Sequence, residues 1–266
     1  LIHILFEKPV SLWPILLQYL HLTNYASLYF SSEELIFGSI VYWSLSVEEH
    51  FYLLFPLMYL FFLKKNYNKN KIAYLLLLLC FLILINRIYL IHYLDSGGAR
   101  VYRSTDTRID SILFGCILAI RFNPIFEDLI IKSEFKLKLL FTFSSALMFF
   151  TLVMDDIFNA PNLRETIRYS LQGLSLMGLF IFTLHIRTGF IFSILNNSII
   201  VFIGKISYTF YLIHMLIILS VINLFSLEEI IPLLVVTLPL CIIYSFLSYE
   251  YIEKPINKYK DLYSRI

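Results

Sequence analysis

Apolar runs long enough to cross a bilayer recur along almost the whole chain, and they constrain its fold more than any other feature. A helix of roughly 20 apolar residues crosses a hydrocarbon core of about 30 Å. This length criterion predicts spans near 43–63, 72–94, 109–121, 139–155, 167–186, 206–225 and 230–250, with 10–22 as the end of an earlier span. We therefore predict an all-α, polytopic membrane protein with about seven to eight transmembrane helices. We expect one membrane-embedded domain over residues 1–266.

The composition excludes other classes of protein. Hydrophobic residues make up 59% of the chain and charged residues 15%, against about 45–50% and 25% in soluble domains. A water-soluble enzyme is therefore excluded. The net charge of +2 and the lack of a basic patch exclude a nucleic-acid partner. Cys80, Cys116 and Cys241 lie far apart in apolar runs, so we expect neither a disulfide framework nor a metal site.

The basic residues predict which side of the membrane each loop faces. Cytoplasmic loops hold the excess of Lys and Arg, and the loop 64–71 is the clearest example. Strict alternation of the spans then places five arginines on the opposite side: Arg100, Arg103, Arg108, Arg164 and Arg168. We expect a multi-pass protein of a bacterial cytoplasmic membrane.

The first polar cluster is Trp43-Ser-Leu-Ser-Val-Glu-Glu-His-Phe-Tyr52. On a helix Ser44, Glu48 and Tyr52 share one face, whereas Glu49 points elsewhere. An ionisable residue at membrane depth indicates function by default. The alternative is an acidic pair at the interface, with Trp43 as an aromatic anchor.

The second cluster is Arg103-Ser-Thr-Asp-Thr-Arg-Ile-Asp110. Ser104 or Thr105 is expected to cap a helix, and the stripe Ser111, Gly115 and Ala119 to let another helix approach closely. Asp110 needs a partner of its own. Arg87, alone in an apolar run, is expected either to snorkel or to line a cavity.

The third cluster combines a polar stripe with an acidic segment. Ser207, Tyr211 and His214 fall on one helical face. Taken alone, His214 is read as a satisfied hydrogen bond between helices. The segment 249–255 is read as an interfacial cap that ends at Pro255.

Together these stretches resemble the acyltransferase 3 family of membrane O-acyltransferases. The resemblance covers residues 43–255 and rests on four motifs in order: Trp43 to Tyr52 with Pro56, Thr105 to Asp110 with Gly115, Gly204-Lys-Ile-Ser-Tyr208 through His214, and Tyr251-Ile-Glu-Lys-Pro255. Each motif alone is weak, but their order is specific. The chain has no counterpart of the first family helix with its His, of the Phe-Phe-x-x-Ser-Gly stretch or of the Arg-x-x-Arg pair. We therefore expect an N-terminally incomplete chain that lacks the family's favoured general base.

The resemblance implies transfer of an acyl group, usually acetyl, from acyl-coenzyme A to a hydroxyl of a cell-surface carbohydrate or lipid-linked glycan. The partners are then acetyl-CoA, the glycan and membrane lipid, with no tightly bound cofactor. Such a transfer needs a base and stabilisation of an oxyanion. We assign Glu48 to orienting or charging the base, or to binding the acceptor hydroxyl. Arg108 is assigned to binding a negatively charged part of a reactant or the developing charge, and Asp110 to holding Arg108 or another cation. Substrate binding is assigned to Trp43, Tyr52, Arg103 and His214.

Two other classes remain open on the sequence. A proton-coupled transporter or flippase also has buried Glu, Asp, Arg and His along its pathway. Many transporters carry two related halves, whereas the Trp43–Pro56 pattern has no second copy. The third class is a catalytically inactive structural relative.

Overall fold

The computed structural model describes residues 12–31, 34–123, 133–158, 161–186, 188–227 and 229–263, and these are helical with no strand. The chain divides into two compact units. Unit 1 comprises Leu1–Ile15, Phe30–Tyr42 and Phe190–Ile266, and unit 2 comprises Leu16–Tyr29 and Trp43–Gly189. The single domain over residues 1–266 stays a prediction.

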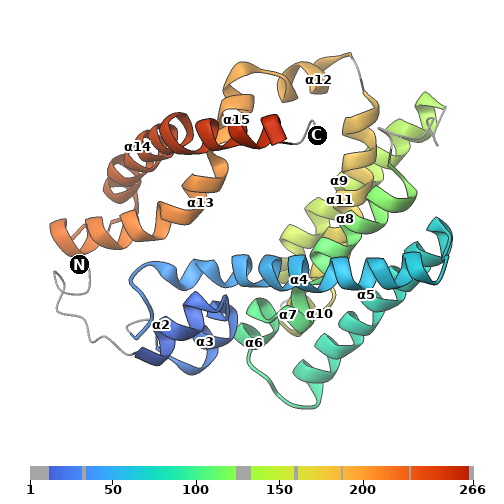
Figure 1. Ribbon diagram of the computed structural model, residues 1–266, viewed down its shortest axis with the longest axis horizontal. Coiled ribbons are helices and arrows are strands. Elements are labelled where there is room, and N and C mark those ends of the chain that lie inside the picture. Colours follow the sequence, from blue (N-terminus) through green and yellow to red (C-terminus); the bar gives the residue numbers. More distant parts are fainter. Residues whose placement is uncertain are drawn as a thin grey trace. The chain divides into compact units, whose positions relative to one another are not determined.

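Helices occupy every span predicted from residue 43 onward (Figure 1). They are α4 (Trp43–Lys64), α5 (Lys69–His92), α8 (Asp110–Arg121), α9 (Glu134–Phe158), α11 (Arg168–His185), α13 (Ser198–Phe225) and α14 (Ile230–Ser248). Among the described residues, four stretches are long and apolar enough to cross a membrane: Lys69–His92, Glu134–Met154, Ser198–Phe225 and Ile230–Tyr259. The helical membrane fold is thus confirmed, and the count of seven to eight crossings stays a prediction.

Shorter helices connect the long ones. They are α2 (Leu12–Tyr19), α3 (Thr23–Tyr29), α6 (Gly98–Arg103), α7 (Thr105–Arg108), α10 (Pro161–Thr166), α12 (Phe190–Leu195), α15 (Lys254–Tyr263), the 3-10 turn η1 (Ser39–Tyr42) and the π-helix η2 (Tyr249–Glu253). Of the run 10–22, the described part forms only the eight-residue α2, which is followed by His21 in the left-handed region at φ 56°.

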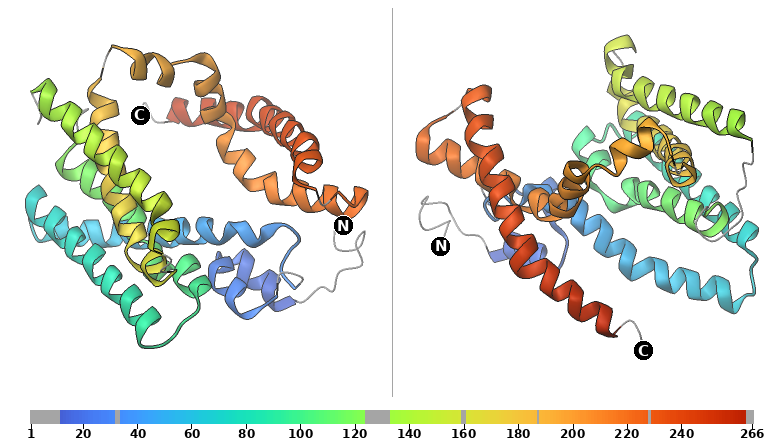
Figure 2. Two further views of the ribbon diagram at one scale, coloured as in Figure 1. Left: turned by 180° about the vertical axis from the view of Figure 1, so that it is seen from behind. Right: turned by 90° about the horizontal axis from the view of Figure 1, so that it is seen from above.

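In unit 2, glycines on α11 let neighbouring helices approach closely. A Cβ at Gly173 would clash with the ring of Phe114 on α8, and one at Gly178 would clash with Ser144 on α9. The Ser175 hydroxyl donates to the Ser144 carbonyl oxygen at 2.7 Å, and α9 and α11 run side by side (Figure 2). The small-residue contact therefore lies on α11. The prediction of such a contact at Ser111, Gly115 and Ala119 is wrong, because these residues are exposed and a Cβ at Gly115 would meet nothing within 4 Å.

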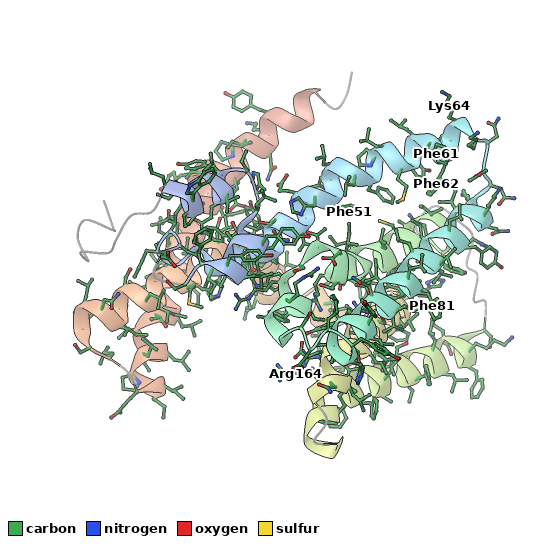
Figure 3. The ribbon with its side chains drawn as sticks, turned by 90° about the horizontal axis from the view of Figure 1, so that it is seen from below. Phe51, Phe61, Phe62, Lys64, Phe81 and Arg164 are labelled. Carbon is green, nitrogen blue, oxygen red and sulfur yellow. The ribbon has the colours of Figure 1, made fainter. Side chains whose placement is uncertain are left out.

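The apolar core of unit 2 joins α4, α5 and α8. Phe51 and Phe62 of α4 are buried there with Leu76 of α5 and Leu113 of α8. Figure 3 labels Phe51 and Phe62 along α4, with Lys64 at the end of this helix. The core therefore holds the first turns of α4 beside the segment from α6 to α8.

In unit 1, α13 and α14 form a side-by-side pair (Figure 1), and the segment before α4 packs on α13. A Cβ at Gly38, where φ is 73°, would lie 2.8 Å from the Leu216 Cα. The Tyr211 hydroxyl donates to the Val41 carbonyl oxygen at 2.6 Å. The prediction that the cap ends at Pro255 is wrong, since α15 continues to Tyr263. Pro255 lies in the first turn of α15, directly after the π-helix η2 and within the continuous stretch Ile230–Tyr259.

Gly173, which is closely packed, and Gly115, which is exposed, provide a matched test. We expect Gly173→Ala to cost about 1–3 kcal/mol of stability, because overpacking displaces the Phe114 ring. Gly115→Ala, the same change at an exposed position of α8, should not lower the thermal midpoint of the purified protein and should raise it slightly, because Ala favours a helix over Gly. Equal midpoints for the two variants would contradict the close packing of α11 on α8.

Candidate functional site

A fully buried ion pair lies at the centre of unit 2. Arg87 of α5 and Asp110 of α8 are both 0% exposed, and two parallel hydrogen bonds of 2.8 and 3.0 Å join the guanidinium to the carboxylate. Arg87 also donates to the Thr107 carbonyl oxygen at 2.7 Å and to the Ser170 hydroxyl oxygen at 2.6 Å. Arg87 therefore neither snorkels nor lines a cavity. It is the partner that Asp110 required.

Arg108 lies in a cage of three aromatic rings. Its guanidinium carbon is 3.9 Å from the centroid of Tyr169, 5.6 Å from that of Tyr102 and 5.9 Å from that of Trp43. We call Arg108 with these three rings the Arg108 cage. Asp110 does not hold Arg108, because Arg87 occupies both carboxylate oxygens. Asp110 thus holds a cation other than Arg108, namely Arg87.

The Arg108 guanidinium makes no hydrogen bond or ion pair with any residue that the structure describes. Its Nε and Nη1 atoms are buried without a hydrogen-bond partner. Burial lowers the pKa of Arg108 from its ordinary value, because the charged form is desolvated. The cage therefore holds a positive charge whose hydrogen-bonding capacity is unused.

Contacts with neighbouring residues fix the positions of the aromatic rings of the cage. Trp43, the first residue of α4, packs on Tyr102 of α6 at 4.7 Å between ring centroids. The Tyr169 hydroxyl, from α11, donates to Glu165 Oε2 at 3.1 Å. Each ring thus comes from a different helix, and only the tertiary fold brings the three together.

A half-exposed ion pair lies on α6 and α7. Arg100 Nη2 is 2.7 Å from Asp106 Oδ2, and the Asn86 amide donates to the same oxygen at 3.1 Å. Burial acts to raise the pKa of Asp106, but the hydrogen bond and charge of Arg100, with the Asn86 hydrogen bond, outweigh it and hold this pKa below its ordinary value. Arg103 donates to the Ser27 carbonyl oxygen at 3.1 Å, so the structure shows it tying α6 to α3.

A histidine that the sequence analysis passed over also belongs to this region. His50 Nδ1 is 2.6 Å from the Thr105 hydroxyl oxygen, which accepts a hydrogen bond from the Asn24 amide at 2.9 Å. Ser104 occupies the N-cap position of α7, as expected, but its side chain makes no capping hydrogen bond. Thr105 makes the contacts with His50 and Asn24, and the Ser104 hydroxyl is buried without a partner. His50 follows Trp43 by seven residues, and this helical spacing was the available signal.

Glu48 and Tyr52 of α4 are not among the residues of the cage. Glu48 is half-buried on α4, and Glu49 beside it is exposed. Tyr52 is 59% exposed, and nine residues place it about 180° around the helix from Trp43, so the two rings do not face one reactant together.

His214 belongs to unit 1, and its contact lies within its own helix. Its Nδ1 is 2.7 Å from the Tyr211 carbonyl oxygen. A carbonyl oxygen only accepts, so Nδ1 carries the proton and Nε2 is left as the acceptor. The hydrogen bond is thus satisfied within α13 and not between helices.

Comparison with known proteins gives one family. Residues 2–249 match the family described as Acyltransferase domain. O-acetyltransferase OatA of Staphylococcus aureus, in strains NCTC 8325 / PS 47 and COL, is 32% identical over 221 residues, which are 81% of this chain and 36% of that protein. The chain thus spans about a third of the length of these relatives. No solved structure matches.

The buried pair predicts a large loss of stability when only one partner is removed. We expect Arg87→Met to cost about 3–5 kcal/mol, because Asp110 is left as an unpaired buried charge. Adding Asp110→Leu should restore most of this loss, which thermal melting of the purified variants measures. A double variant no more stable than Arg87→Met would contradict the pairing.

The Arg100–Asp106 pair predicts a pH dependence. Because the pKa of Asp106 is lowered in the fold, its stabilising effect is present above the ordinary carboxyl value of about 3.9 and is lost as the pH falls through the folded-state value. We expect Asp106→Asn to melt lower than the parent at neutral pH and the gap to close on acidification. Asp95→Asn is the control, at an exposed carboxyl without an ion pair among the described residues. A gap that is constant with pH would refute the assignment.

Proposed function

This chain belongs to the family described as Acyltransferase domain, and from that membership we propose that it is the membrane part of an O-acyltransferase. The relatives that it matches carry the name O-acetyltransferase, which supports acetyl as the transferred group. We further propose acetyl-CoA as the donor and a hydroxyl of a cell-surface carbohydrate or lipid-linked glycan as the acceptor. The protein would work as one multi-pass domain in a bacterial cytoplasmic membrane.

The reaction consists of one bond exchange at a carbonyl carbon. The acceptor oxygen bonds to the thioester carbon, the carbon–sulfur bond breaks, and the hydroxyl proton passes through a base to the departing thiolate. The protein must therefore supply a base, stabilise the tetrahedral oxyanion and hold both reactants. Glu48 is our candidate for orienting or charging the base, or for binding the acceptor hydroxyl.

Arg108 carries the structural part of the proposal. Its guanidinium has no protein partner among the described residues and is walled by Trp43, Tyr102 and Tyr169. These features suit the binding of a negative group on a reactant, with Trp43 available to pack on a ring. Asp110 contributes as a positioning residue, because it holds Arg87 at the base of the same region. Arg103, Tyr52 and His214 remain proposals for substrate binding.

The adjacent glutamates allow a matched test in cells that carry the natural gene. We expect Glu48→Gln to lower the O-acetyl content of the surface glycan by at least about 100-fold, because the variant keeps the shape of Glu48 and loses its charge. Glu49→Gln should leave that content unchanged. Proton NMR of the purified glycan, with the gene deletion as the zero point and equal protein levels, measures both.

The outcomes separate the parts of the proposal. Loss of acetyl in the deletion alone would keep the enzyme and remove the role of Glu48. Unchanged acetyl in the deletion would overturn surface-glycan acetylation as the function.

A further inference from the structure

The charges around the Arg108 cage do not balance locally. Asp110 and Glu165 are the nearby carboxylates, and both are engaged: Asp110 by Arg87, and Glu165 by Tyr169 and by Arg164 Nε at 3.4 Å. Arg168, next to Tyr169 in the chain, lies 5.2 Å from the Tyr169 ring, and its Nε is also buried without a hydrogen-bond partner. Two guanidinium groups therefore meet at one ring without an anion of their own among the described residues.

The geometry of the cage indicates which kind of ligand would fit the unused donors of Arg108. An aromatic ring covers a face of a guanidinium, whereas the N–H donors point outward in its plane. The Tyr169 ring, at 3.9 Å, therefore leaves the donor edges of Arg108 unused. A planar fork of donors is matched by an oxyanion with two adjacent acceptor oxygens, and phosphate groups offer this geometry. A compact ammonium would not present the same fork.

From these observations we propose that the Arg108 cage is a binding site for a phosphate group carried by a reactant, with Arg168 as a second ligand. The inference rests on the proposed function in one respect, namely that its reactants bear phosphates. Coenzyme A carries a diphosphate, and so does a glycan linked to a polyprenyl lipid carrier.

The position of the cage favours the acceptor as the source. Arg87, whose guanidinium carbon is 5.6 Å from the centroid of the Tyr169 ring, follows the first residue of α5 by 18 residues, or about 27 Å of helix. The basic loop 64–71 precedes α5, and the excess of positive charge assigns that loop to the cytoplasm. The cage then lies near the opposite face of the membrane. A phosphate at that face belongs to a lipid-linked acceptor, since coenzyme A is cytoplasmic.

The test uses the purified natural protein, with inorganic pyrophosphate as the probe and no acyl donor present. Binding to the folded state raises the thermal midpoint. We expect pyrophosphate to raise the midpoint of the parent, Arg108→Gln to lose this rise, and Arg108→Lys to weaken it. Arg121→Gln is the matched control, because Arg121 also lies on an aromatic ring, Phe122 at 5.2 Å, outside the cage. The control should keep the full rise.

The midpoint without ligand separates a binding role from a structural role. If Arg108 serves a ligand, Arg108→Gln removes a half-buried charge that has no hydrogen-bond partner among the described residues, and it should melt no lower than the parent. A clearly lower midpoint, a retained pyrophosphate shift in Arg108→Gln, or no shift in the parent overturns the proposal.

Competition identifies the source of the phosphate. Displacement of pyrophosphate by a polyprenyl diphosphate assigns the site to the acceptor, and displacement by coenzyme A assigns it to the donor. Failure of both ligands to displace pyrophosphate overturns the reactant site. The proposed function fails separately, since surface O-acetylation can be absent while pyrophosphate still binds, or present while it does not.

Discussion

The buried ion pair between Arg87 and Asp110 is the constraint on which unit 2 depends. Neither charge is exposed, and in a low-dielectric interior each is tolerated only with its partner in place. The pair joins α5 to α8, and the hydrogen bond to Ser170 adds α11. The donation to the Thr107 carbonyl oxygen also fixes the end of α7 just before α8 begins. The position of the next residue, Arg108, follows from this arrangement.

Arg87 and Arg108, which lie in one region, thus differ in their hydrogen bonding. Arg87 uses both terminal nitrogens on a carboxylate, a carbonyl and a hydroxyl, whereas Arg108 contacts only aromatic faces. Stability alone would favour an apolar side chain at Arg108, since an unpaired buried charge is costly. Retaining such a charge is expected where binding requires it, and stability is commonly lower at functional sites.

Elsewhere, several polar side chains in the long helices form a hydrogen bond within their own helix. Ser220 donates to the Leu216 carbonyl oxygen and Thr142 to that of Lys138, and His185 and His214 contact carbonyl oxygens one turn earlier. Such local hydrogen bonds remove the cost of a polar group in lipid without any ligand. This distinction separates a polar residue that the membrane merely tolerates from one with unused hydrogen-bonding capacity.

The sequence by itself determined the helical membrane fold, because hydrophobic length is a local property that each span carries alone. It also showed that Asp110 needed a partner and that Trp43, Glu48 and Arg108 were candidate site residues. Only the tertiary structure decided that Arg87 is that partner, 23 residues away, and that Tyr169 and Tyr102 close around Arg108. Contacts between helices depend on the rotation and crossing of each helix, which periodicity does not encode. For the same reason the close helix approach lies at Gly173 on α11 and not at Gly115 on α8, although both glycines are equally visible in the sequence.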